Sequence, residues 1–333
     1  MSMASMHTNA LAWTRVTRIL FPGLVFIISG IAANPLQAQE VYALAGWMQT
    51  DTPVSSSYAW TLSYAQNFSN HISASYSWLN EGHFPGHHRD GNVTQLWWRS
   101  NPLGGFTFAG GAGVYRYFDT VLAENPSGYA DAHGWGIVYS LSATHSLTKR
   151  LDVQVRVDRV ALLNHIDTTS AMVGFGWKLA QDHGTEESTR AFARPWEVTL
   201  LAGQTIVNSF SSPKSLATSA ELRWRWGSVL RVSASYVNEG DDRLIRRNGT
   251  LAEGWLEPSF FDDRVTFGVG VGGYLSIDHH QPEGAGRSLS GVVTTTTSWN
   301  IVSSWVVRAS WHRIVTNYNR DSDILLMGIG YRL

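Results

Sequence analysis

The sequence predicts an all-β fold, an antiparallel barrel that spans a membrane, and three observations lead to this prediction. Apolar residues alternate with small or polar ones at a period of two, which is typical of strands. The chain is rich in Gly (31), Trp (15), Tyr (12) and Phe (13), whereas charged residues make up only 15% of its 333 residues. After the N-terminal region no segment is apolar for the roughly 20 residues that a spanning helix needs.

The charge balance and the absence of cysteine exclude several classes of function. The 25 basic and 26 acidic residues nearly cancel, so no electrostatic reason points to nucleic acid as a partner. Without cysteine there is no disulfide framework, no lipid-modified cysteine and no thiolate ligand or nucleophile. We expect no cofactor and no metal site.

The first 38 residues are predicted to be a secretory signal peptide. Two arginines precede an apolar run from Ile19 to Ala33, and Pro35 and the small Ala38 follow it. A positive start, a short apolar run and a small residue at the end are the features of such a leader. We therefore expect the mature chain to begin near Gln39.

The mature chain is predicted to form about sixteen strands. The segment "SYAWTLSYAQNF" places Tyr58, Trp60, Leu62 and Tyr64 on one face, and "VTFGVGVGGY" repeats the pattern with Val265, Phe267, Val269 and Val271. The opposite faces carry Ser, Thr, Ala and Gly rather than the charged residues usual on an exposed soluble sheet. About eight such segments lie between Glu40 and Leu179, and about eight more between Trp196 and Leu333.

The connections between the predicted strands alternate in length. Short ones such as "SNH" and "LTKR" alternate with longer polar ones, which are predicted as loops at 81–92, 120–132 and 241–248. This alternation is typical of the periplasmic turns and extracellular loops of membrane barrels. Spanning backbone must satisfy all its hydrogen bonds internally, so a closed barrel is the sheet that fits.

The chain contains an internal duplication. Val153–Leu179 aligns with Val307–Leu333 without a gap, and Arg159/Arg313 and Gly174/Gly328 are among the shared residues. The period of about 155 residues defines two eight-strand repeats, 39–180 and 196–333, joined by a polar connector at 181–195.

Two closures of the sixteen strands are open at this point. A single closed ring is the usual solution, so one sixteen-stranded barrel is the favoured prediction. The long connector and the glycines of the inner faces favour two tandem eight-stranded barrels, which is the alternative.

The ends of both repeats carry a resemblance to a known class. "GFGWKL" and "GIGYRL" resemble the C-terminal assembly signal of bacterial outer-membrane β-barrels, with Leu333 at the place where that pattern usually has Phe. The resemblance implies the outer membrane of a Gram-negative bacterium. It also implies outer-membrane lipid, lipopolysaccharide and the barrel assembly machinery as partners.

A polar element occurs once in each repeat, and we term it the loop element. It reads Asn-Glu-Gly, then six residues, then Arg-Asp/Asn-Gly, and it is predicted to lie in extracellular loops. Its residues are Asn80, Glu81, Gly82, Arg89, Asp90 and Gly91 in the first repeat, and Asn238, Glu239, Gly240, Arg247, Asn248 and Gly249 in the second. We expect its acid and arginine to pair and stiffen the hairpin. The alternative is a binding or catalytic ring.

A second group of polar residues is predicted to face a lumen. In "AELRWRW", Glu221, Arg223 and Arg225 alternate with Leu222, Trp224 and Trp226, so the charged residues share one face. Arg308 and His312 are placed on the inner face by the same reasoning. In a wide barrel these residues line a weakly basic channel, and in a narrow barrel they fill it.

The last two predicted strands are similar in layout to the lipid A deacylase family of outer-membrane barrels. The resemblance implies a catalytic role for His312 and Asp323, but Ile314 stands where that family has its nucleophilic serine. The missing serine therefore argues against an enzyme. The sequence favours an outer-membrane barrel of structural or transport type that passes an unidentified solute or polymer. The alternatives are a lipid-modifying enzyme and a surface recognition or adhesion barrel.

Overall fold

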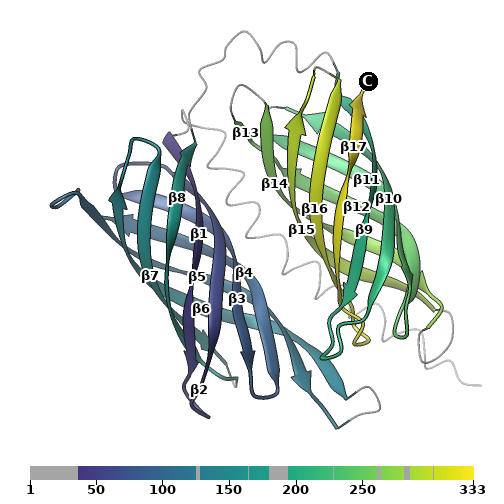
Figure 1. Cartoon of the computed structure of the whole chain (residues 1–333), viewed down its shortest axis with the longest axis horizontal. Coiled ribbons are helices and arrows are strands. Elements are labelled where there is room, and N and C mark those ends of the chain that lie inside the picture. Colours follow the sequence, from purple (N-terminus) through teal and green to yellow (C-terminus); the bar gives the residue numbers. More distant parts are fainter. Residues whose placement is uncertain are drawn as a thin grey trace, which may run out of the picture. The chain divides into compact units, whose positions relative to one another are not determined.

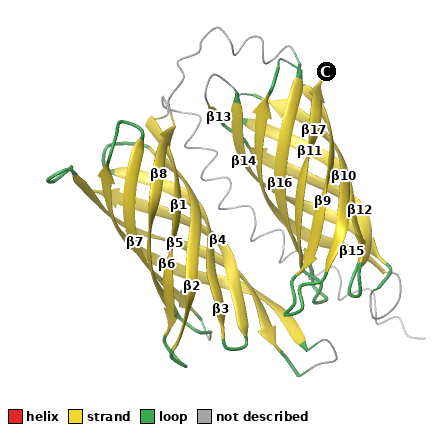
Figure 2. Ribbon diagram, viewed as in Figure 1, coloured by secondary structure: helices red, strands yellow, loops and turns green. Residues whose placement is uncertain are grey.

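The computed structural model describes residues 37–124, 128–163, 165–179, 194–227, 229–260, 264–280, 286–302 and 304–333. Residues 1–36 of the predicted leader and 181–193 of the predicted connector lie outside the described residues. Strands make up all the regular structure of the described part (Figure 2). No helix in this part has the length and apolarity to cross a membrane.

The first barrel closes from eight antiparallel strands (Figure 1). They are β1 (Gln37–Thr50), β2 (Ser55–Asn67), β3 (Ile72–Phe84), β4 (His87–Arg99), β5 (Phe106–Leu122), β6 (Tyr129–Ser146), β7 (Leu151–Leu162) and β8 (Thr168–Leu179). Since the strands run up and down, β1 begins and β8 ends at the same end of the barrel. We call this the terminal end, and the opposite one the hairpin end.

The second barrel repeats this arrangement. Its strands are β9 (Trp196–Val207), β10 (Lys214–Trp226), β11 (Leu230–Asp241), β12 (Arg246–Leu256), β14 (Val265–Asp278), β15 (Gly286–Asn300), β16 (Trp305–Val315) and β17 (Ser322–Arg332). A two-residue strand, β13 (Ser259–Phe260), pairs with β14 beside the ring. Pairing of β12 with β14 and of β17 with β9 closes the barrel. The all-β class and the two eight-strand units are confirmed.

Each half closes on itself, so the prediction of one sixteen-stranded ring is wrong and its alternative is correct. Glycines permit the close approach of backbones where each barrel closes. A methyl group on Gly46 would collide with the backbone of Ala171, and one on Gly203 would collide with that of Leu325. The equivalent glycines of β8 and β17 have the same property. These seams fit a tightly curved, narrow ring, which eight strands form.

Burial follows the period of two along most of the strands, whereas β3 and β4 also contain runs of consecutive buried residues. Along β10 the buried Glu221 and Arg223 alternate with Leu222, which is 44% exposed, and the half-buried Trp224. The inner faces are thus polar and charged, while the outer faces are apolar and aromatic. This polarity is the reverse of that of a soluble protein, whose buried face is apolar.

Strands extend through the predicted loops. The chain between β3 and β4 is only Pro85 and Gly86, and β11 and β12 are joined by residues 242–245. The loop predicted at 81–92 is therefore mostly strand, and in the loop predicted at 241–248 only 242–245 lie outside strands. Polar composition indicated a loop there, but the same residues also suit a polar barrel wall. The strands β5 and β6, with 17 and 18 residues, are longer than the others.

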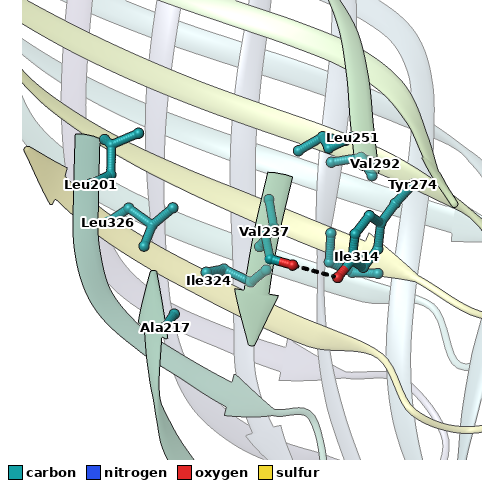
Figure 3. Packing of buried hydrophobic residues seen from close by; sticks show 9 residues of the cluster. All are labelled: Leu201, Ala217, Val237, Leu251, Tyr274, Val292, Ile314, Ile324 and Leu326. Carbon is teal, nitrogen blue, oxygen red and sulfur yellow. Dashed lines mark hydrogen bonds between the residues drawn. The ribbon is translucent and has the colours of Figure 1, made fainter. Parts of the chain in front are cut away.

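An apolar layer lies inside the second barrel, toward its hairpin end. Its members are Leu201, Ala217, Val237, Leu251, Tyr274, Val292, Ile314, Ile324 and Leu326 (Figure 3). The hydroxyl of Tyr274 donates to the carbonyl of Val237 at 3.5 Å. Because the layer takes residues from all eight strands, it fills the cross-section of the barrel with side chains.

Candidate functional site in the barrel interiors

A buried ion pair lies at the hairpin end of the second barrel. Arg247 and Glu239, on neighbouring strands, are both fully buried, and the guanidinium binds both carboxylate oxygens, with Nη2 at 2.7 Å from Oε2. Arg247 also donates to Ser322 Oγ at 2.7 Å and to the Tyr318 hydroxyl at 3.0 Å. The serine hydroxyl in turn donates to Glu239 Oε2 at 2.7 Å. Such bidentate pairing satisfies two charges removed from water.

The first barrel carries a related cluster at the equivalent level. Glu81 is 1% exposed and accepts hydrogen bonds from the hydroxyl groups of Tyr115, at 2.9 Å, and Thr168. Arg89 is also buried, and its guanidinium lies 5.3 Å from the centre of the Phe84 ring. Thr168 opens the last strand of the first barrel as Ser322 opens that of the second, so the duplication extends to the interiors.

The loop element therefore lies in strands. Asn80, Glu81 and Gly82 belong to β3, and Arg89, Asp90 and Gly91 to β4; Asn238, Glu239 and Gly240 belong to β11, and Arg247, Asn248 and Gly249 to β12. Gly240 has a positive φ of 82°, and the β11–β12 register shifts around it. The expected pairing of acid and arginine occurs within the second-barrel hairpin, but it occurs inside the barrel.

Both barrels repeat a tryptophan contact. Trp97 donates from Nε1 to Ser75 Oγ at 2.8 Å, and Trp255 does the same to Ser233 at 2.8 Å. Each indole lies against a glycine of the next strand in the ring: a methyl group added to Gly270 would come within 2.6 Å of the Trp255 ring. Gly111 has the same relation to Trp97. These inner-face glycines make room for a large ring in a narrow interior.

His312 lies midway along the inside of the second barrel. Its Nε2 is 3.0 Å from Ser310 Oγ, and its Nδ1 is 3.1 Å from Thr294 Oγ1 and 3.6 Å from Glu253 Oε1. All four side chains are buried. A hydroxyl, an imidazole and a carboxylate in this order resemble a nucleophile with its base, but the apolar layer covers them on one side and an ion-pair network on the other. The arrangement serves as a buried polar cluster, in which Glu253 Oε2 has no hydrogen-bond partner among the described residues.

His312 and Asp323 do not form a site together. His312 pairs in register with Ile324, whereas Asp323 pairs with Arg313, so the two side chains leave the sheet on opposite faces. Asp323 accepts from Trp311 Nε1 and from Arg313 Nη1, each at 2.8 Å. The deacylase resemblance requires a histidine and an acid that act on one face, and this geometry does not supply it.

An ion-pair network fills the second barrel nearer its terminal end. Arg308 binds Glu197 at 2.5 Å and Glu221 at 2.6 Å, and Arg223 binds Glu257 at 2.5 Å and Glu221 at 3.2 Å. All five side chains are buried. Sequence reasoning missed Glu197 and Glu257. The available signal was the alternation of the strands, which places both glutamates at inward positions. Glu197 lies opposite the inward Arg223 in the β9–β10 register.

A small polar cavity of about 50 Å³ lies inside the first barrel. Glu40, Arg99, Trp97 and Arg156 are among the residues that line it. Arg156 is held by Asp158 at 2.6 Å and by Gln95 at 2.8 Å. At about 10–15 Å³ for each water, the cavity has room for a few water molecules.

The histidines near the tip of the β3–β4 hairpin make local contacts. The rings of His83 and His88 stack with their centroids 4.0 Å apart, and His87 Nδ1 lies 2.8 Å from Asp119 Oδ2. Within the described ranges no three His, Asp or Glu residues are grouped as metal ligands would be.

Comparison with known proteins gives likeness to solved structures. No protein family model and no curated protein sequence matches the chain. The Neisserial surface protein A is 10% identical, with a TM-score of 0.38, over 44% of this chain and 99% of that one. The N-terminal barrel of Pseudomonas aeruginosa OprF is 13% identical, with a TM-score of 0.34, over 43% and 99%. The Ralstonia pickettii toluene transporter TbuX is 10% identical, with a TM-score of 0.25, over 91% and 90%.

Proposed function

We propose that the protein is an integral protein of a Gram-negative outer membrane. Each of its two narrow barrels exposes apolar side chains to lipid and does not pass bulk solute. The observation that carries the proposal is the reversed polarity of closed barrels. Along β17, Leu325, Met327 and Ile329 are 46%, 64% and 56% exposed, while the neighbouring inward positions are polar, small or part of the buried layer. Lipid is the solvent that stabilises such an outer face.

Aromatic residues at the terminal end of the second barrel support this proposal. The outward Trp196 and Trp224 have ring centroids 6.1 Å apart, and Trp224 and Trp226 are 5.8 Å apart. Trp305 and Tyr331 meet edge to face at 5.0 Å. Rings of this kind gather where a bilayer meets water, because one part of the ring is apolar and the other is polar.

The interior supports a closed barrel of structural type. The second barrel is filled in succession by the Glu239–Arg247 pair, the apolar layer, the His312 group and the ion-pair network. An apolar layer that takes residues from every strand leaves no wet path, so the channel hypothesis with Arg223, Arg225 and Arg308 as its lining is not favoured. In planar bilayers we expect no steady conductance steps, and regular steps from the purified protein would contradict the closed interior.

A lipid-facing substitution tests the membrane location. Met327→Arg should weaken folding by about 2–4 kcal/mol if the residue faces the middle of a bilayer. Val302→Arg is the control, because Val302 is 55% exposed but lies in the turn between β15 and β16. Urea unfolding in lipid vesicles measures both. Equal stabilities for the two variants, or recovery of the wild type as a soluble periplasmic protein, would refute the proposal.

The last strand supports assembly as an outer-membrane protein. Tyr331 and Leu333 are exposed on the outer face, 40% and 59%, and Arg332 between them bonds Glu197 on the inside at 3.1 Å. We propose that the assembly machinery reads these outward residues. Deleting 322–333 should abolish insertion, as seen by loss of the heat-modifiable band on gels, and normal insertion of the truncated chain would exclude this role.

One observation favours a second candidate function, recognition at the cell surface. A tilted strand of about 9–11 residues crosses a bilayer, and β5 and β6 exceed this length by several residues. Their hairpin therefore extends beyond the membrane at the hairpin end. Replacing 121–130 with an Asn-Gly turn should keep the barrel folded and lower adhesion of expressing cells to epithelial monolayers. Unchanged adhesion would exclude this candidate.

A further inference from the structure

The two barrels are filled differently inside, near their terminal ends. In the second barrel Glu197 of β9 pairs in register with the buried Arg223, which belongs to the ion-pair network. The counterpart of Glu197 in the first barrel is Glu40 of β1, and it pairs with Ala65. The small side chain of Ala65 thus stands where the second barrel has a guanidinium group.

Two further exchanges act in the same direction. The ungapped alignment of the last strands places Gln154 at the position of Arg308. Ser73 stands where the second barrel has Arg231, because each lies two residues before the serine that accepts the tryptophan N–H. The cavity of about 50 Å³ lies here in the first barrel, whereas the arginines of the second barrel line a cavity of about 20 Å³. The first barrel is therefore more open at this level.

Hydroxyl groups of buried serines face this cavity without a partner in the described part of the chain. Ser73 and Ser142 line it and are 4% and 9% exposed, and neither hydroxyl is hydrogen-bonded to another described residue. A buried hydroxyl that lacks a partner costs free energy. A molecule that brings donors and acceptors to this place is therefore stabilised there.

The charges of the cavity are balanced. Glu40, Arg99 and Arg156 are the charged residues among the described residues that line it. Arg156 binds Asp158 at 2.6 Å, and Arg99 Nη2 lies 3.7 Å from Glu40 Oε1. Because each charge has an opposite one beside it, an ion would lose its hydration without finding a countercharge. A neutral molecule is the better match.

The cavity can be reached from the terminal end of the barrel. Arg99 is the last residue of β4, and its side chain is 21% exposed, while Thr107, which also lines the cavity, is the second residue of β5. Farther from this end the Arg156 guanidinium lies 5.0 Å from the centre of the Trp97 ring. A solute can therefore enter past Arg99 and stop at these two residues.

We propose that this cavity binds a small neutral polyol. Each hydroxyl of a polyol both donates and accepts, so it can bond to the serine hydroxyls that lack partners. A water takes up about 30 Å³ of liquid volume, and the few waters for which the cavity has room correspond to a solute of roughly 100 Å³, the size of glycerol or erythritol. The second barrel, which is filled by ion pairs at this level, does not bind it.

The test uses the full chain folded in lauryldimethylamine oxide micelles, because this detergent has no sugar headgroup that would compete. With ¹⁵N-labelled tryptophan, the Nε1–H resonance of Trp97 reports on the cavity, since this group donates to Ser75 Oγ, which lines it. Trp97→Phe assigns the resonance. Erythritol is the probe, and sodium glycerate is its charged counterpart of similar size. We expect erythritol to shift the resonance until it saturates.

Three variants and one control locate the binding. Ser73→Ala and Ser142→Ala should each weaken erythritol binding about three- to tenfold, the loss expected for one hydrogen bond. Ala65→Arg introduces the residue that the second barrel has at this position and should abolish binding. Ser77→Ala is the control, because Ser77 is buried on the same strand as Ser73 but is not among the residues that line the cavity.

The heat-modifiable gel band verifies folding of each variant. A saturating shift that Ser73→Ala and Ser142→Ala weaken, and that Ser77→Ala leaves unchanged, supports the proposal. Several results would overturn it: a shift that does not saturate, equal binding by the wild type and both lining variants, or an equal loss in Ser77→Ala. Binding by folded Ala65→Arg, or tighter binding of glycerate than of erythritol, would do so as well.

Discussion

The buried Glu239–Arg247 pair makes the strongest quantitative prediction. Both side chains are fully buried, whereas the next residue, Arg246, is 60% exposed and lies 3.5 Å from Asp241. Removing one partner of a buried pair leaves a charge without compensation, which costs about 3–5 kcal/mol. An exposed pair contributes about 0–1 kcal/mol. Arg247→Met should therefore destabilise the second barrel several times more than Arg246→Met.

A double-mutant cycle separates the interaction energy of the Glu239–Arg247 pair from the other effects of each substitution. Arg247→Met also removes donors to Ser322 and Tyr318, so Glu239→Leu is measured alone and together with it. The double variant should be more stable than either single variant, because it buries no isolated charge. Urea unfolding in lipid vesicles, followed by the gel shift, gives each free energy. A cost of Arg247→Met within about 1 kcal/mol of that of Arg246→Met would refute the reasoning.

Three further predictions concern packing and pH. Gly270→Ala should cost about 1–3 kcal/mol through collision with the indole beside it, whereas Gly291→Ala, with open space around the added methyl, should cost little; equal urea midpoints would contradict this. Ile324→Ala in the apolar layer should cost about 2–5 kcal/mol in the same assay, and a wild-type midpoint would show that the layer is loosely packed. A hydrogen bond from Arg159 lowers the pKa of Asp51 in the β1–β2 turn. That pair stabilises the fold above the unfolded pKa of Asp51, and the effect is lost as pH falls through the folded pKa. Arg159→Gln should raise the pKa measured by NMR, and an unchanged value would disprove the coupling.

The period of two was sufficient to predict the strands and their outward faces, because these depend on residues close in sequence. The duplication was predictable because the two halves align with each other without a gap in their last segments. Strand ends were less predictable. Glu81 and Arg89 were expected in a loop, since a polar residue suits a loop and a polar barrel wall equally well. Only the strand pairing distinguishes the two.

The interior sites depend on contacts across the ring. His312 meets Glu253 from a strand that is distant in sequence, and Asp323 is turned to the opposite face by the β16–β17 register. A shift of one residue in register would reverse these faces. The sequence shows which residues of a strand share a face. It does not show the register between strands, which brings particular side chains together.

The two halves close separately, although the same sixteen strands could in principle form one larger ring. A single ring would pair the last strand of the first repeat with the first strand of the second across the connector at 181–195. Its loop-closure entropy differs from that of two rings by only about 1 kcal/mol, in favour of the single ring. Chain connectivity therefore does not select the observed topology. The curvature of the sheet selects between the two topologies. The glycines at the closing seams and the contacts between tryptophan and glycine in the interiors fit a narrow barrel, and both would lose their partners in a wider one. Bulky substitutions at Gly46 and Gly203 would thus change which ring the chain prefers, and a duplicated barrel could become one larger barrel through a few inner-face residues.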